Sequence, residues 1–169
     1  MLQQFLSTLP ALPVVSQRAR PTGLVAGTLV RTEQGDMPVE FLLGGDRIVT
    51  SSGEVVELRA TSVLDARAID IVRFFRAGPE GTSADDLIVP ADQPILVRDW
   101  RAMVVHGRES ILTPAASLVD DVQIRRERVE QVRLFRLHFD RPQVIFANGV
   151  EVASVRRPSA PDPRSSMLH

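Results

Sequence analysis

Short apolar runs alternate with polar turn residues along most of this chain. Between residues 23 and 155, runs of Val, Ile, Leu, Phe and Thr recur at a spacing of about ten residues, bounded by Gly, Pro, Asn, Asp or Ser. Segments with the period of an amphipathic helix are scarce. The pattern predicts an all-β domain built from short antiparallel strands.

Four segments carry turn residues between these runs: 33–36 (EQGD), 44–46 (GGD), 51–53 (SSG) and 148–149 (NG). Gly, Asn and Asp tolerate the positive φ angles that tight turns require. The Asn148-Gly149 pair lies between the runs VIFA and VEVAS, and Asn-Gly is typical of a two-residue hairpin turn. We therefore expect a β-hairpin there.

Two segments depart from this pattern. Thr113 is suited to be an N-cap and Pro114 to the first helical position, which predicts one short helix over residues 114–118. Residues 120–131 (DDVQIRRERVEQ) place Val122 and Ile124 among charges and predict an exposed hairpin. A pair of solvated, charged strands explains that segment without any binding role.

The chain is long enough for one hydrophobic core with a tail at each end. We expect a partly ordered lead-in over residues 1–22, one domain over 23–156, and a disordered tail over 157–169, where Pro and Ser are frequent. The first residues lack a positive stretch ahead of their apolar residues, and Pro10 and Pro13 interrupt the apolar run. This predicts neither a signal peptide nor a membrane span.

Charge and composition narrow the possible functions. The 20 basic residues are all Arg and are balanced by 21 acidic residues, for a net charge of -1. A basic stripe is missing, so we expect no nucleic-acid partner. The absence of Lys, Cys and Tyr excludes Schiff-base chemistry, thiolate nucleophiles and Cys-ligated zinc. A chain without Cys is compatible with a reducing cytosol, although this leaves the compartment open.

Three stretches together carry a more specific pattern. They read AGTLVRTEQGDMPVEFLLGGDRIVTSSGEVVEL, DDLIVPADQPILVRDWRAMVV and LFRLHFDRPQVIFANGVEVAS. In this combination the chain resembles the Hint (Hedgehog/intein) family, in particular its bacterial stand-alone branch. The resemblance implies a horseshoe of curved antiparallel strands. It also implies a family chemistry of autoproteolysis or protein splicing.

In that family the domain opens with a nucleophile, usually Cys, four residues before the Gly-Thr pair, and here that position is Gly23. The family's His in the second stretch corresponds to Gln93, and its histidines in the third stretch correspond to Arg136 and Pro142. Glycine has no side chain that can attack a carbonyl, and an amide cannot relay a proton near neutral pH. The resemblance therefore predicts a Hint fold with a degenerate active site.

Three residues are the remaining candidates for catalysis. Thr22 has a hydroxyl one position before Gly23, Asp92 precedes Gln93, and His138 lies two residues from Arg136 on one strand face. Each has a structural explanation as well: Thr22 as part of the linker, Asp92 as a turn residue before Pro94, and His138 as an ordinary strand residue. The same holds for His106 and His169.

Other chemistry finds little support. Three dispersed His and no Cys predict no metal site, and we expect no cofactor. The acidic residues at 85–86 and at 120–121 are adjacent in the sequence. In an extended strand the two side chains of each pair would point to opposite faces, so neither pair converges on one site. Trp100 lies between Arg98 and Arg101, and it either anchors a partner or packs at a strand edge.

These observations favour a non-cleaving Hint-type domain that acts as an interaction module for another protein, through a concave surface between Gly23 and Gln93. The alternative is an autocatalytic, self-cleaving domain that uses Thr22 as nucleophile, with His138 or Asp92. A generic small β domain remains the third interpretation, and it is favoured if the first and last strands do not lie around a shared cleft.

Overall fold

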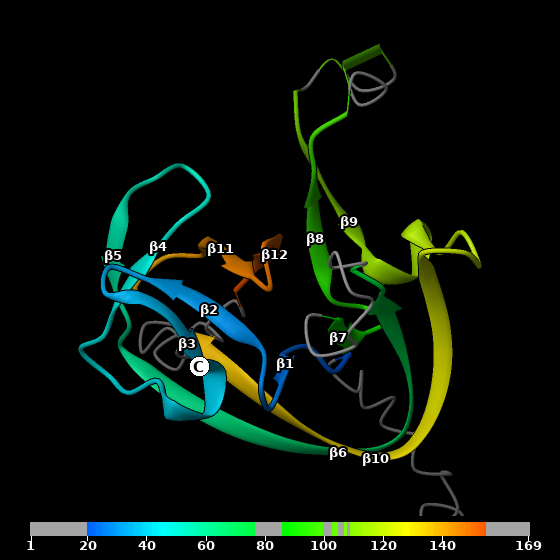
Figure 1. Ribbon diagram of the computed structural model, residues 1–169, viewed down its shortest axis with the longest axis horizontal. Coiled ribbons are helices and arrows are strands. Elements are labelled where there is room, and N and C mark those ends of the chain that lie inside the picture. The colour runs from blue at the N-terminus through cyan, green and yellow to red at the C-terminus, as the bar shows by residue number, and fades with distance from the viewer. Residues whose placement is uncertain (1–19, 77–85, 100–102, 105–106, 108, 155–169) are drawn as a thin grey trace, which may run out of the picture.

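Curved antiparallel strands form an open horseshoe in the computed structural model of the protein, which describes residues 20–76, 86–99, 103, 104, 107 and 109–154 (Figure 1). The prediction of an all-β fold is confirmed. Several sequence predictions fall outside the described residues: the lead-in up to residue 19, the tail over 157–169, Asp85, Trp100, His106 and His169.

The strands form two sheets. The first contains, in spatial order, β1 (Leu24–Val25), β10 (Ile124–His138), β6 (Ala60–Phe74) and β7 (Leu87–Pro90). The second contains β5 (Val55–Glu57), β4 (Arg47–Val49), β2 (Leu29–Thr32), β11 (Val144–Ala147), β12 (Val150–Ala153), β8 (Pro94–Val97) and β9 (Ile111–Pro114), with β3 (Gly35–Pro38) paired to β2. Neighbouring strands in both sheets are antiparallel.

The long strands β6 and β10 pair along their whole length and curve around the base of the horseshoe (Figure 1). Much of this ribbon is exposed, and ion pairs connect residues on its two strands. Arg133 lies opposite Asp65, with 2.8 Å between Nε and Oδ1. Within β6, Ala68 has a φ of 50°, a left-handed conformation that is uncommon for a residue with a side chain.

The hairpin predicted over residues 120–131 is wrong. From Ile124 onward this segment belongs to the single strand β10, whose partner β6 is distant in sequence. The chain reverses at 120–123, where Asp120 Oδ1 accepts backbone hydrogen bonds from Val122 at 2.9 Å, and from Gln123 and Ile124 at 2.8 Å. The hydrogen bonds from these N–H groups hold the pKa of Asp120 below its ordinary value, and the bond from Ile124 has the largest effect.

The predicted short helix also needs correction. Residues 115–118 form a 3-10 helix, η3 (Ala115–Leu118), and Pro114 occupies its cap position without a side-chain hydrogen bond. Thr113 is not the cap, because it is paired with Ile95 as part of β9. A further 3-10 helix, η1 (Val39–Phe41), follows β3 and was not predicted.

The hairpin predicted at Asn148-Gly149 is confirmed, since these residues connect β11 and β12 with φ angles of 46° and 78°. The Asn148 side chain also ties the turn to its neighbours. Its Oδ1 accepts a hydrogen bond from the Leu29 backbone at 2.7 Å, and its Nδ2 donates to the Asp86 carbonyl at 3.0 Å. The turn thereby joins β2 to the segment that enters β7.

One hydrophobic core fills the space between the sheets. Its fully buried members come mostly from alternating strand positions of both sheets: Val30, Ile48, Leu58, Val72, Leu87, Val89, Leu134, Ile145 and Val152. Leu24 of β1, Leu137 of β10 and Val152 of β12 also belong to the core, and their burial helps to bring the beginning and the end of the domain together. Across the described residues, no helix has the length and apolar character needed to span a membrane.

Candidate functional site

Three of the four residues at family catalytic positions, Gly23, Gln93 and Arg136, converge on one spot in the structure. Gly23 enters β1, which pairs with β10 so that Leu24 lies opposite Phe135, one residue before Arg136. Gln93 follows the turn between β7 and β8, where its backbone N–H donates to the Pro90 carbonyl at 3.0 Å. All three residues line the same small cavity.

Gln93 is the centre of this arrangement, and its side chain is only 2% exposed. Its Oε1 accepts the backbone hydrogen bond of Gly23 at 2.9 Å, and its Nε2 donates to the carbonyl oxygen of Ala153 at 2.8 Å and of Pro94 at 3.2 Å. A buried amide is tolerated when its donor and acceptor are both paired. Gln93 therefore joins the start of β1 to the end of β12.

The backbone at Gly23 leaves no room for a side chain. Its φ is 143°, and a Cβ placed there would lie 3.0 Å from Leu134 Cβ and 3.0 Å from the carbonyl oxygen of Phe135. The second neighbour is backbone of a long paired strand, so it cannot move aside cheaply. Glycine is thus required here both by conformation and by packing.

The cavity at this spot has a volume of about 10 Å³ and is lined by Gly23, Gln93, Arg136, Val152 and Ser154, among others. That is close to the minimum space for one water molecule. Arg136 Nε is buried and, among the described residues, has no hydrogen-bond partner. The space at the site is too small for a ligand larger than a water molecule in this conformation.

The other candidates lie around this spot without completing it. Thr22 is partly buried beside Gly23, and no hydrogen bond of its hydroxyl is found among the described residues. His138 Nε2 lies 2.7 Å from the Ser62 hydroxyl on β6, and His138 does not line the cavity. Pro142 is exposed in the loop between β10 and β11.

Asp92 does not line this small cavity and instead lines a second, wider cleft of about 430 Å³. Its Oδ1 lies 3.3 Å from Arg20 Nη1, in an ion pair whose side chains are 37% and 79% exposed. Asp70 lines the same cleft. A hydrogen bond from Arg126, and to a smaller extent one from Arg128, holds the pKa of the Asp70 carboxyl below its ordinary value. Sequence reasoning missed Arg20 and Asp70, because neither lies near a family motif.

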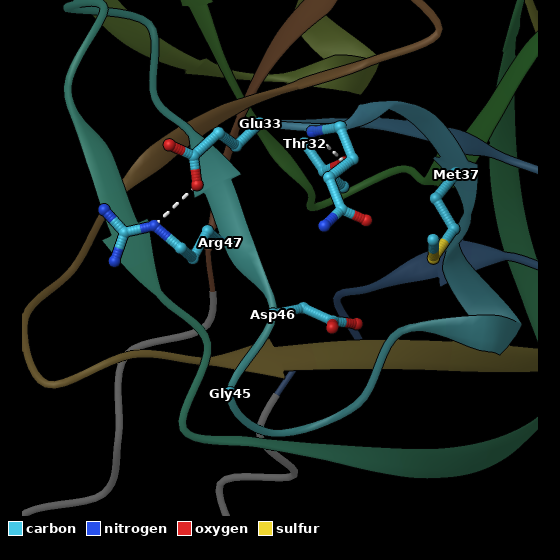
Figure 2. Close-up of a pocket in the computed structure, with 7 residues that line it drawn as sticks. Thr32, Glu33, Met37, Gly45, Asp46 and Arg47 are labelled. Atoms are coloured by element: carbon cyan, nitrogen blue, oxygen red, sulfur yellow. Dashed lines mark hydrogen bonds and ion pairs between the residues drawn. The ribbon is translucent and has the colours of Figure 1, made fainter.

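A third hollow of about 140 Å³ lies on the far side of the second sheet, between β2, β3 and β4. Figure 2 shows the Glu33–Arg47 ion pair, at 2.7 Å, on one side of this hollow and Met37 on the other. No residue of this hollow was a candidate from the sequence. In the described residues, His, Asp and Glu do not gather into a group of three or more that could hold a metal ion.

Known proteins resemble this chain in both sequence and fold. The Hint domain family matches residues 22–158. The DnaB intein from Synechocystis sp. has a TM-score of 0.57 at 11% identity, covering 80% of this chain and 100% of that one. The bacterial intein-like domain from Clostridium thermocellum has a TM-score of 0.55 at 18% identity, covering 80% and 99%.

The gp41-1 intein has a TM-score of 0.52 at 11% identity, covering 78% of this chain and 98% of that one. At these identities the structural likeness establishes the fold, and it confirms the predicted Hint-like horseshoe. No curated protein matches the chain. The family match spans every strand from β1 to β12, and the chain therefore belongs to the Hint domain family.

Proposed function

We propose that this Hint domain does not cleave itself and acts as an interaction module for another protein. The observation that carries the proposal is the hydrogen bond from the Gly23 N–H to Gln93 Oε1, at 2.9 Å. It brings the position of the family's nucleophile and the position of its histidine together, and neither residue has the required chemistry. The peptide bond between Thr22 and Gly23 is held in place but not attacked.

Self-cleavage needs a nucleophile, a group that moves its proton and donors for the oxyanion. Gly23 supplies no nucleophile, and the Gln93 amide already uses its oxygen on Gly23 and its nitrogen on Ala153. Arg136 supplies a permanent positive charge and no base at neutral pH. Together these residues hold the two ends of the domain, which supports a structural use of the site.

The alternative is self-cleavage with Thr22 as nucleophile. For that reaction the Thr22 hydroxyl must lose its proton to a nearby base and attack the carbonyl carbon of Pro21. The Pro21–Thr22 C–N bond then breaks, the Thr22 nitrogen takes up the proton, and water hydrolyses the resulting ester. The nearest candidates do not favour this. The His138 ring is engaged with Ser62, and the Asp92 carboxylate with Arg20.

The intact mass of the purified full-length protein separates these two functions. The protein and its Thr22→Ala variant are incubated with and without thiol or hydroxylamine, which cleave ester and thioester intermediates. An undivided species of 18.6 kDa in every sample supports the proposal. Fragments that end at residues 20–22 in the unmodified protein, and that disappear in the variant, contradict it and identify Thr22 as an active nucleophile.

A further inference from the structure

The turn between β11 and β12 (orange in Figure 1) contains the chain's one asparagine, Asn148, directly before Gly149. Because glycine has no Cβ, nothing on the second residue hinders its backbone nitrogen. That nitrogen can attack the side-chain carbon of the asparagine and displace ammonia, which is the first step of deamidation. The sequence thus places a reactive pair in the turn, and the surrounding contacts decide whether it reacts.

Hydrogen bonds hold both ends of the Asn148 side-chain amide. Its Oδ1 accepts from the Leu29 N–H at 2.7 Å, and its Nδ2 donates to the Asp86 carbonyl at 3.0 Å. The Asn148 N–H also donates to the Leu29 carbonyl at 2.8 Å, so the backbone of the turn is fixed to β2 as well. The amide is therefore held between a strand of the second sheet and the segment that enters the first.

Arg76 covers the peptide group between the two residues of the pair. Its Nη1 donates to the Asn148 carbonyl oxygen, and a Cβ added at Gly149 would overlap with its guanidinium. The Arg76 N–H donates to Asp86 Oδ1 at 3.1 Å, so Arg76 and Asn148 are both fixed to Asp86. The guanidinium thus lies against the peptide group whose nitrogen would attack.

Deamidation is incompatible with these contacts. In the reaction the Gly149 nitrogen forms a bond to Cγ of Asn148 and gives up its proton, while the bond between Cγ and Nδ2 breaks and Nδ2 leaves as ammonia. Ring closure turns Cγ toward Gly149, which takes Oδ1 away from the Leu29 N–H and removes the donor to Asp86. Both hydrogen bonds must therefore break first, and the pair reacts only when the hairpin opens locally.

The product cannot restore the original contacts. Water opens the ring and leaves a carboxylate, either on an aspartate side chain or on an isoaspartate whose main chain runs through the former side chain. A carboxylate has no hydrogen to donate at neutral pH, so the Asp86 carbonyl loses its partner. The new charge also lies beside Asp86, whose own carboxylate is only 5% exposed. Like charges in such a place disfavour each other.

We propose that Asn148 is a deamidation site that the folded domain holds inactive, and that reaction there permanently weakens the attachment of the β11–β12 hairpin to the segment before β7. Water is the co-reactant and ammonia the leaving group. The inference is independent of the proposed function, because Gln93 binds the opposite end of this hairpin, at the Ala153 carbonyl.

The first test compares the reaction in the folded and the unfolded full-length protein. Samples are incubated at mildly alkaline pH in native buffer and in concentrated urea. Trypsin then releases residues 137–156, and mass spectrometry gives the deamidated fraction of Asn148. The reaction should be at least about tenfold slower in native buffer, because two hydrogen bonds must break first. The free peptide of residues 137–156, in both solutions, corrects for any effect of urea on the chemistry. Equal corrected rates overturn the inference.

Arg76 provides a matched pair of variants. Arg76→Ala removes the guanidinium from the turn and should raise the rate in native buffer about threefold. Arg67→Ala, at an exposed position in the middle of β6, should leave the rate unchanged. Circular dichroism checks that both variants are folded. If both react at the rate of the unmodified protein, the contacts around the turn do not protect Asn148 and the inference fails.

Asn148→Asp reproduces the aspartate product directly. It should unfold at a lower urea concentration than the unmodified protein, because the Asp86 carbonyl has lost its donor. Gln131→Glu makes the same change from amide to carboxylate at an exposed position opposite Arg67, and it should not lower the urea midpoint. A midpoint for Asn148→Asp equal to that of the unmodified protein would show that the reaction does not weaken the hairpin, and would contradict the inference.

Discussion

Two neighbouring residues of this domain, Asp92 and Gln93, lie in opposite environments. Gln93 is almost completely buried and lines a cavity of about 10 Å³, whereas Asp92 is partly exposed and lines a cleft of about 430 Å³. Both are held by the same turn between β7 and β8. The backbone thus leaves the Asp92 side chain partly exposed to solvent and directs the Gln93 side chain into the domain.

The difference in chemistry follows from the difference in burial. A neutral amide can be buried when both its ends are hydrogen-bonded, while an ionised carboxylate needs water or a charged partner. Gln93 meets the first condition with Gly23 and Ala153, and Asp92 meets the second with solvent and Arg20. The buried amide of Gln93 is therefore suited to stability, whereas the carboxylate of Asp92 stays in contact with solvent.

Removing the buried amide should have the largest effect on stability. Gln93→Leu keeps the volume but leaves the Gly23 N–H and the Ala153 carbonyl without partners, so we expect a loss of about 2–4 kcal/mol in unfolding free energy. Asp92→Asn, one residue away, should change it by less than about 0.5 kcal/mol. Urea unfolding of both variants measures the contrast, and similar losses for the two would remove the distinction.

A side chain at Gly23 should have the next largest effect. Gly23→Ala places a Cβ 3.0 Å from Leu134 and from the Phe135 carbonyl, and we expect a loss of about 2–3 kcal/mol. Gly27→Ala is the matched control, because Gly27 also has a positive φ but no atom within 4 Å of the added carbon. It should cost about 1 kcal/mol. Equal costs would show that packing at Gly23 does not matter.

Local sequence patterns predicted the fold well where neighbouring residues decide the structure. The Asn148-Gly149 turn and the alternating strands are of this kind. The hairpin predicted at 120–131 failed because its strand pairs with β6, fifty or more residues away in the sequence, and such pairing leaves no local signal. Thr113 failed as a cap for the same reason, since pairing with Ile95 holds it extended.

For the site, the structure brings Gly23, Gln93 and Arg136 to one cavity, although nothing in the sequence showed how small that cavity is. Phe135 lines this cavity and lies close to Gly23 in space, yet the two are remote in the chain. The open cleft was missed because Arg20 and Asp70 belong to no motif. Contacts between distant segments are the information that the sequence pattern lacks.

A substitution at Ala68, in the ribbon of β6 and β10, should have a smaller effect on the unfolding free energy, and it should raise that energy rather than lower it. Ala68 has a left-handed φ of 50°, which glycine adopts without the steric cost of a Cβ. Ala68→Gly should raise the unfolding free energy by about 0.5 kcal/mol, after the greater entropy of the unfolded glycine is subtracted. Ala66→Gly, in extended backbone on the same strand, should lower it by about 1 kcal/mol. Loss of stability in both variants would contradict the conformation at Ala68.

Low pH should remove the small contribution that the ion pairs of Asp70 make to the unfolding free energy. Because Arg126 and Arg128 lower the pKa of Asp70 in the folded state, its ion pairs stabilise the protein above the ordinary pKa of 3.8 and lose that contribution as pH falls through the lower, folded value. The unfolding free energies of the unmodified protein and Asp70→Asn should therefore differ at pH 7 and converge once the pH falls below the lowered pKa of Asp70. A gap that persists at low pH would show that Asp70 acts through something other than its charge.

The fate of the peptide bonds around Thr22 tests the central claim most directly. Trypsin releases the peptide of residues 19–31, ARPTGLVAGTLVR, because it does not cut before Pro21, and an isotope-labelled copy of this peptide allows its amount to be measured. After prolonged incubation of the full-length protein with hydroxylamine, the account predicts no loss of this peptide. Its progressive loss, with a new N-terminus at Thr22 or Gly23, would contradict the proposal that this Hint domain does not cut itself.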